Sequence, residues 1–124
     1  MELNPWDAYA VLWLYLAQAR DGKEGKGELE ENVARLDLQG WPQPIFNLYL
    51  GKTTPEAVLA AARDADQKKE REKQCQAYLF LGQYALAQEN RTEAVRLFKQ
   101  AIDTGATTVT EYHIARAELK RLGQ

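Results

Sequence analysis

Apolar residues recur every three or four positions along most of the chain, which is the spacing of one face of an α-helix. Glycines and capping residues interrupt this spacing, and no segment shows the sustained apolar–polar alternation typical of a half-buried strand. The pattern predicts helices over about 5–20, 28–38, 42–50, 55–66, 73–88, 90–105 and 108–122. We therefore expect an all-α chain made of helix–turn–helix pairs.

Several helix ends carry start and stop residues. Asn90 with Glu93, and Thr108 with Glu111, have the spacing of a capping box, in which a side chain at each end of the motif bonds to the backbone of the other. The segment 63–73 contains five basic and four acidic residues and no large apolar residue. Mixed charge at this density is typical of a solvated face, so we interpret it as an exposed helix end or a short connection.

Composition agrees with this pattern. Ala and Leu make up 34 of the 124 residues, whereas the strand formers Ile and Val make up 8. The formal net charge is −2, which removes the main electrostatic argument for nucleic-acid binding. One cysteine and one histidine exclude an internal disulfide and argue against a zinc cluster. No motif of a phosphate loop, nucleophile elbow or metalloprotease is present, so we predict no enzyme activity, metal or cofactor.

Residues 75–108 carry the most informative motif. Numbered from Cys75 as position 1 of a 34-residue unit, the segment matches six of eight characteristic positions of a tetratricopeptide repeat. The departures are Ala85 at position 11 and Ala106 at position 32. Because a glycine inside a helix costs about 1 kcal/mol, Gly82 indicates that two helices approach closely there. The matching residues, at positions 4, 7, 8, 20, 24 and 27, are Tyr78, Leu81, Gly82, Ala94, Phe98 and Ala101.

The chain also resembles the C-terminal half of the bacterial NlpI-like lipoprotein family. The runs Leu12–Ala17, Asn47–Gly51 and Tyr78–Gly82 occur there in the same order, and Glu111–His113 and Leu122–Gln124 are similar to the end of that family. The resemblance implies a scaffold of the cell envelope. Proteins of that kind form dimers and bind peptidoglycan hydrolases and a periplasmic protease.

Together these observations predict a single tetratricopeptide-like domain over 1–124, folded as a right-handed superhelical stack. Two degenerate helix pairs cover 5–38 and 42–66, and the best-matching repeat covers 75–108. The segment 108–122 begins like a further repeat but lacks a second helix, so we expect a C-terminal capping helix.

The resemblance to tetratricopeptide repeats implies a concave groove that binds a partner peptide or helix. Positions 2, 5, 9 and 12 of each first helix line such a groove, and this mixed polar and apolar set suits protein recognition. In this chain the predicted groove residues are Gln76, Leu79, Gln83, Leu86, Thr110, His113, Ala117 and Lys120. The alternative is that the groove is closed by the chain's own helices or by a second copy.

Two single residues have chemical alternatives. His113 has no neighbouring nucleophile or ligand in its helix, so we interpret it as a groove residue rather than a general base. Cys75 lies near the start of a helix, where the helix dipole activates a thiol, but a structural cysteine is the simpler interpretation.

The first predicted helix is apolar nearly all round, so most of its sides must be covered. Either the next helices cover it, or its outer face binds a second copy through Trp6, Tyr9 and Trp13. The chain is then a homodimerising structural module. A third hypothesis is an accessory domain of a larger protein.

Membrane and targeting signals are absent from the pattern. The longest apolar stretch, 8–17, is shorter than the roughly 20 residues that span a bilayer, and residues 1–7 do not resemble a signal peptide. The resemblance suggests the periplasm or cell envelope. If Met1 is the natural start, we expect a cytoplasmic protein.

Overall fold

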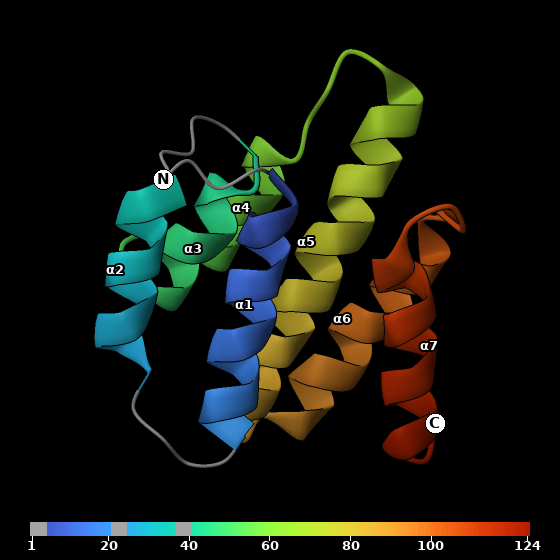
Figure 1. Ribbon diagram of the computed structural model, residues 1–124. Coiled ribbons are helices and arrows are strands. Elements are labelled where there is room, and N and C mark those ends of the chain that lie inside the picture. Colours follow the sequence, from blue (N-terminus) through green and yellow to red (C-terminus); the bar gives the residue numbers. More distant parts are fainter. Residues whose placement is uncertain (1–4, 21–24, 37–40) are drawn as a thin grey trace. The chain divides into compact units, whose positions relative to one another are not determined.

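The computed structural model describes residues 5–20, 25–36 and 41–124. Within these ranges the chain forms seven α-helices and no strand, which confirms the predicted all-α class (Figure 1). The helices are α1 (Pro5–Arg20), α2 (Lys26–Leu36), α3 (Gln43–Tyr49), α4 (Pro55–Ala61), α5 (Gln67–Ala87), α6 (Arg91–Asp103) and α7 (Thr110–Arg121).

These helices belong to two units. Unit 1 is Met1–Thr54 and contains α1 to α3, whereas unit 2 is Pro55–Gln124 and contains α4 to α7. The division falls inside the predicted helix pair 42–66, between α3 and α4. The superhelical stack and the single domain over 1–124 stay predictions.

Unit 1 is organised around α1, which packs against α2. The side chain of Gln18 on α1 donates a 2.8 Å hydrogen bond to Glu28 on α2. Tyr15 on α1 stacks on Tyr49 of α3, with ring centroids 5.3 Å apart. Gly51, with a φ of +78°, follows α3 in the left-handed conformation that favours glycine, as expected for a helix stop. The buried apolar residues of this unit include Ala8, Leu12, Leu16, Leu29, Ile45, Phe46, Leu48 and Tyr49.

Unit 2 is built on the pair α5 and α6, which run antiparallel to each other (Figure 1). α7 packs against both helices of this pair, and α4 packs against α5. The guanidinium of Arg91, in the first turn of α6, donates to the backbone carbonyl of Leu122, just after α7. Because α5 has neighbours on several sides, its residues are buried almost continuously from Cys75 to Ala85.

Gly82 marks the closest approach of α5 and α6. A Cβ built on Gly82 would lie 2.5 Å from the nearest ring carbon of Phe98, closer than side-chain carbons come in folded proteins. The two residues therefore fit together only because position 82 has no side chain. This contact confirms the expectation that a small residue is needed where these two helices meet.

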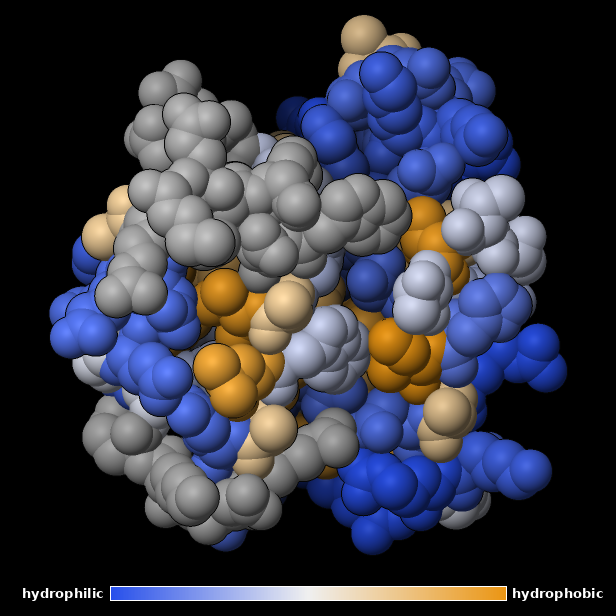
Figure 2. All heavy atoms as spheres, viewed as in Figure 1, coloured by the Kyte–Doolittle hydropathy of each residue, from blue (hydrophilic) through white to orange (hydrophobic). Residues whose placement is uncertain are grey.

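The start of α5 differs from the prediction. α5 begins at Gln67 rather than near Lys73, because the Asp66 carboxylate accepts hydrogen bonds from the backbone N–H groups of Lys68 and Lys69. The first turns of α5 are nevertheless exposed, as the charge pattern indicated. Figure 2 shows almost only hydrophilic surface where Figure 1 draws the beginning of this helix.

The two predicted capping boxes have different outcomes. At α6 the Asn90 side chain accepts a 3.2 Å hydrogen bond from the backbone N–H of Glu93, as predicted. At α7 the predicted box is wrong: the N-cap is Val109, with no side-chain cap, and the helix starts two residues later than Thr108. Glu111, the expected partner, is buried and accepts a hydrogen bond from α5 instead.

Candidate functional site

His113 and Cys75 are the two residues for which the sequence leaves a chemical alternative. No group of three or more His, Cys, Asp or Glu side chains among the described residues is placed to hold a metal ion. His113 lies on the surface, its Nε2 3.0 Å from the backbone carbonyl of Thr107 and its ring edge-on to Tyr112. These contacts orient the imidazole without supplying a nucleophile.

Cys75 is fully buried in α5. The pKa of its thiol is raised to about 11, chiefly by burial; a hydrogen bond with Thr104 acts in the opposite direction, and the nearby Glu111 carboxylate adds to the increase. A thiol with so high a pKa is protonated at neutral pH and is a poor nucleophile. These values agree with a structural cysteine.

The predicted groove residues of α5 are partly covered. Leu79 is completely buried and Gln83 is 2% exposed, whereas Gln76 and Leu86 are half-buried. The Gln76 amide donates a 3.2 Å hydrogen bond to Glu111 of α7. A partner can contact Leu79 and Gln83 only if these buried side chains become exposed. The α5 half of the groove therefore stays a prediction.

The predicted groove residues of α7 are accessible. Thr110, His113, Ala117 and Lys120 are all exposed. Ala117 and Lys120 also border a shallow depression between the ends of α6 and α7. The α7 half is thus an open surface rather than a cleft.

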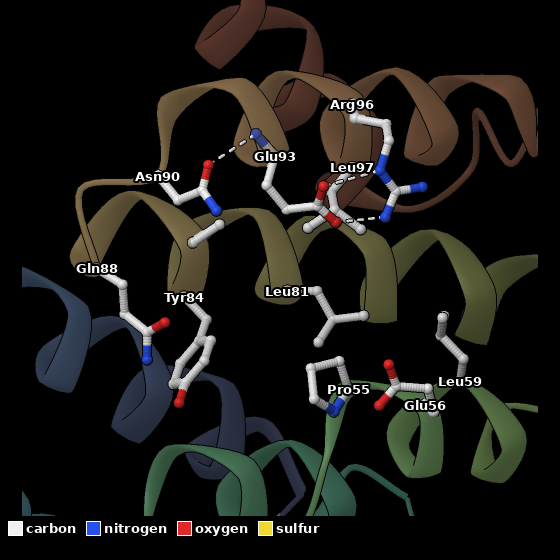
Figure 3. Close-up of a pocket in the computed structure, with 11 residues that line it drawn as sticks. Pro55, Glu56, Leu59, Leu81, Tyr84, Gln88, Asn90, Glu93, Arg96 and Leu97 are labelled. Atoms are coloured by element: carbon white, nitrogen blue, oxygen red, sulfur yellow. Dashed lines mark hydrogen bonds and ion pairs between the residues drawn. The ribbon is translucent and has the colours of Figure 1, made fainter.

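A pocket that the repeat register did not indicate lies within unit 2. It occupies about 220 Å³ between α4, α5 and α6 (Figure 3). Leu81, Ala85 and Leu97 are apolar lining residues, which together we call the floor of the pocket. Leu59 lies at one side (Figure 3). The remaining lining residues are Pro55, Glu56, Tyr84, Gln88, Asn90, Glu93 and Arg96.

One end of the pocket presents amide groups. Asn90 uses its side-chain oxygen to cap α6, which leaves its amide nitrogen directed toward the pocket (Figure 3). Gln88 lies next to it and is exposed, with no hydrogen-bond partner for its side chain among the described residues. These amides can donate to, and Gln88 can also accept from, the backbone of a bound chain.

The other end of the pocket carries charge. Arg96 donates through Nε to Glu93 at 2.9 Å, through Nη2 to the second oxygen of the same carboxylate, and through Nη1 to Gln100 at 2.9 Å. This pairing lowers the pKa of Glu93 and raises that of Arg96. Glu56, on the facing wall, is exposed and takes part in no ion pair between described residues.

The residues proposed for self-association lie on α1. Tyr9 and Trp13 are half-buried, and the side chain of Trp6 lies outside the described residues. The fully buried face of α1 is instead Ala8, Leu12 and Leu16. Leu14 is 43% exposed, and apolar side chains are visible along the course of α1 (Figure 2).

Comparison with known proteins gives no assignment. No protein-family model matches the sequence, and no solved structure matches the chain. The resemblances to tetratricopeptide repeats and to the NlpI-like family stay predictions. In the described part of the chain, no helix has the length and apolar character needed to cross a membrane.

Proposed function

We propose that the chain is a non-catalytic interaction module, and that it binds a segment of a partner protein in the pocket between α4, α5 and α6. The observation that carries this proposal is the pocket itself, in which apolar lining residues lie between amide groups and charged groups. Protein-recognition sites commonly combine an apolar anchor position with a polar rim.

The arrangement of unit 2 supports the same proposal. In a helical repeat array, a third helix packs against both helices of the preceding pair, and α7 has these contacts with α5 and α6. The resemblance to the NlpI-like family extends the proposal to a partner in the cell envelope, such as a peptidoglycan hydrolase.

A site-specific crosslink tests the pocket as the binding site. A photoreactive amino acid at Gln88 should capture a partner from the source cells, because this side chain lies at the pocket mouth. The same group at Lys99, exposed on α6 and outside the pocket lining, is the matched control. Ala85→Leu should abolish the crosslink by filling the floor, while circular dichroism shows a folded chain. A crosslink that survives Ala85→Leu contradicts the proposal.

Self-association through α1 is a second candidate, favoured by the exposure of Leu14. Exposed Ala10 and Ala17 each lie about one turn from it, at i−4 and i+3, on the same side of the helix. We expect sedimentation to show a concentration-dependent mass that Leu14→Glu reduces to that of a monomer. A wild-type chain that is monomeric at all concentrations excludes this candidate.

A further inference from the structure

The size of the pocket restricts its occupant. Sites for small molecules and cofactors usually enclose about 300–1,000 Å³. The pocket between α4, α5 and α6 has about 220 Å³, which is enough for one side chain and too little for a typical metabolite or cofactor. Because the floor of Leu81, Ala85 and Leu97 is apolar, the side chain that fits there is apolar as well.

The charge of the pocket restricts the neighbours of that side chain. Both oxygens of the Glu93 carboxylate accept hydrogen bonds from Arg96, and Arg96 also donates to Gln100. The two opposite charges make this pair neutral as a whole. Glu56 remains as the one charged lining residue without an ion pair between described residues. A cation beside the bound side chain is therefore attracted, and an anion is repelled.

The amide end indicates how the bound chain runs. Gln88 and the amide nitrogen of Asn90 supply hydrogen-bonding groups opposite the charged end (Figure 3). A backbone in extended conformation exposes its carbonyl and N–H groups and accepts such partners. A peptide that bonds to these amides at one end and places a cation near Glu56 at the other crosses the apolar floor between them.

From these three features, and resting on the proposed function, we propose that the pocket recognises an extended peptide with a buried apolar side chain flanked by Lys or Arg. Leu, Ile or Phe enters the floor, the peptide backbone bonds to Gln88 and Asn90, and the basic residue pairs with Glu56. The partner is thus identified by a short basic–apolar motif.

The test uses fluorescein-labelled pentapeptides with a central Leu, flanked on both sides by Lys, Gln or Glu, and measures fluorescence anisotropy with the full chain. The Lys-flanked peptide should bind about fivefold to tenfold more tightly than the Glu-flanked one, as expected for an exposed charge pair. Glu56→Lys should reverse this order, and a central Ala should abolish binding.

The control separates local recognition from overall charge. Asp103→Lys changes the net charge by the same amount at an exposed site on α6 outside the pocket, and it should leave the order of the peptides unchanged. If Leu peptides bind with no preference for the flanking charge, the basic–apolar motif is wrong although the pocket still binds peptides. If no Leu peptide binds the wild type better than the Ala85→Leu variant, the proposed function fails too.

Discussion

Units 1 and 2 are both built from packed helices, but different contacts hold these helices together. In unit 2, α5 and α6 approach closely because Gly82, which has no side chain, leaves room for the Phe98 ring. In unit 1, α1 buries Ala8, Leu12 and Leu16, and the long side chains of Tyr15 and Gln18 add contacts to α3 and α2. Long side chains can adjust to a small displacement of one helix against another. A phenyl ring packed directly on the backbone of a glycine cannot adjust in this way.

This difference shows why the contact between α5 and α6 could be predicted from the sequence, whereas the contact between α1 and α3 could not. A glycine inside a helix is uncommon enough to indicate a close contact, and Asn90 marks the start of α6 in the same unit. The stacking of Tyr15 on Tyr49 leaves no such mark, since aromatic residues occur on α1 in several directions.

The largest expected effect comes from Phe98→Ala, which empties the contact with Gly82. We expect a loss of about 3–5 kcal/mol in the free energy of unfolding. All three tryptophans lie in unit 1, so their fluorescence reports on that unit alone, whereas circular dichroism reports on both. In urea, Phe98→Ala should shift the dichroism transition more than the fluorescence transition.

The matched variant in unit 1 is Leu12→Ala, at a fully buried position of α1. It should reverse the pattern and shift the fluorescence transition more, with a loss of about 2–5 kcal/mol. If either variant moves both transitions equally, the two units unfold as one, and the contrast between them has no thermodynamic counterpart.

The next effect concerns the reactivity of Cys75 inside unit 2. A pKa of about 11 instead of the ordinary 9.0 lowers the thiolate fraction at pH 8 by about a hundredfold. Alkylation of the native chain should be slower than that of the chain unfolded in guanidinium by at least this factor. Equal rates would show that the interior of unit 2 opens freely.

Gly82→Ala has a smaller effect because two contributions oppose each other. Alanine favours the helix by up to about 1 kcal/mol, but its Cβ overlaps the Phe98 ring, and overpacking costs about 1–3 kcal/mol. We expect a net loss of about 1–2 kcal/mol by urea titration. Adding Phe98→Leu should recover part of it, and a Gly82→Ala chain more stable than wild type would refute the close approach.

Asn90→Ala removes the side-chain cap of α6 and should cost about 1 kcal/mol. Thr108→Ala, at the predicted box that the structure does not form, should cost much less, because α7 has no side-chain cap. Thermal melts of the two variants make the comparison directly. Equal losses would mean that Thr108 stabilises the start of α7 after all.

The smallest effect is at the start of α5. The hydrogen bond from Lys73, 2.9 Å away, lowers the pKa of Asp64 below its ordinary 3.8, with a further contribution from the backbone N–H of Asp66. Because folding lowers the pKa of Asp64, its carboxylate stabilises the folded chain at neutral pH. This contribution is lost as the pH falls through the pKa that Asp64 has in the folded state. Asp64→Asn should therefore be slightly less stable at pH 7 and equal to wild type at pH 2.

Much of unit 2 was predictable from residues whose roles are local. The helix pair α5 and α6, the Asn90 cap and the function of Gly82 follow from spacing and from the special geometry of glycine. The start of α5 was missed because its first turns are charged and exposed, so apolar periodicity gives no signal there. The Asp66 cap was the available clue.

The candidate site was harder to predict. Its lining comes from three helices and spans positions 55 to 97, and a pocket arises from gaps between helices rather than from a residue pattern. The inward orientation of Glu111 was missed for a related reason: its partner Gln76 lies 35 positions away. Repeat numbering predicts which helix face is concave but not which side chains cover it.

The burial of Cys75 has a practical consequence for labelling. Since the native thiol is unreactive at neutral pH, a cysteine introduced at an exposed position is the only one that a reagent modifies, and no cysteine-free background is required. Ala17→Cys on α1 and Lys99→Cys on α6, both exposed in the wild type, give a pair of attachment points for spin labels. The distance between these two labels measures how far apart the two units lie, while Cys75 in the interior stays unlabelled.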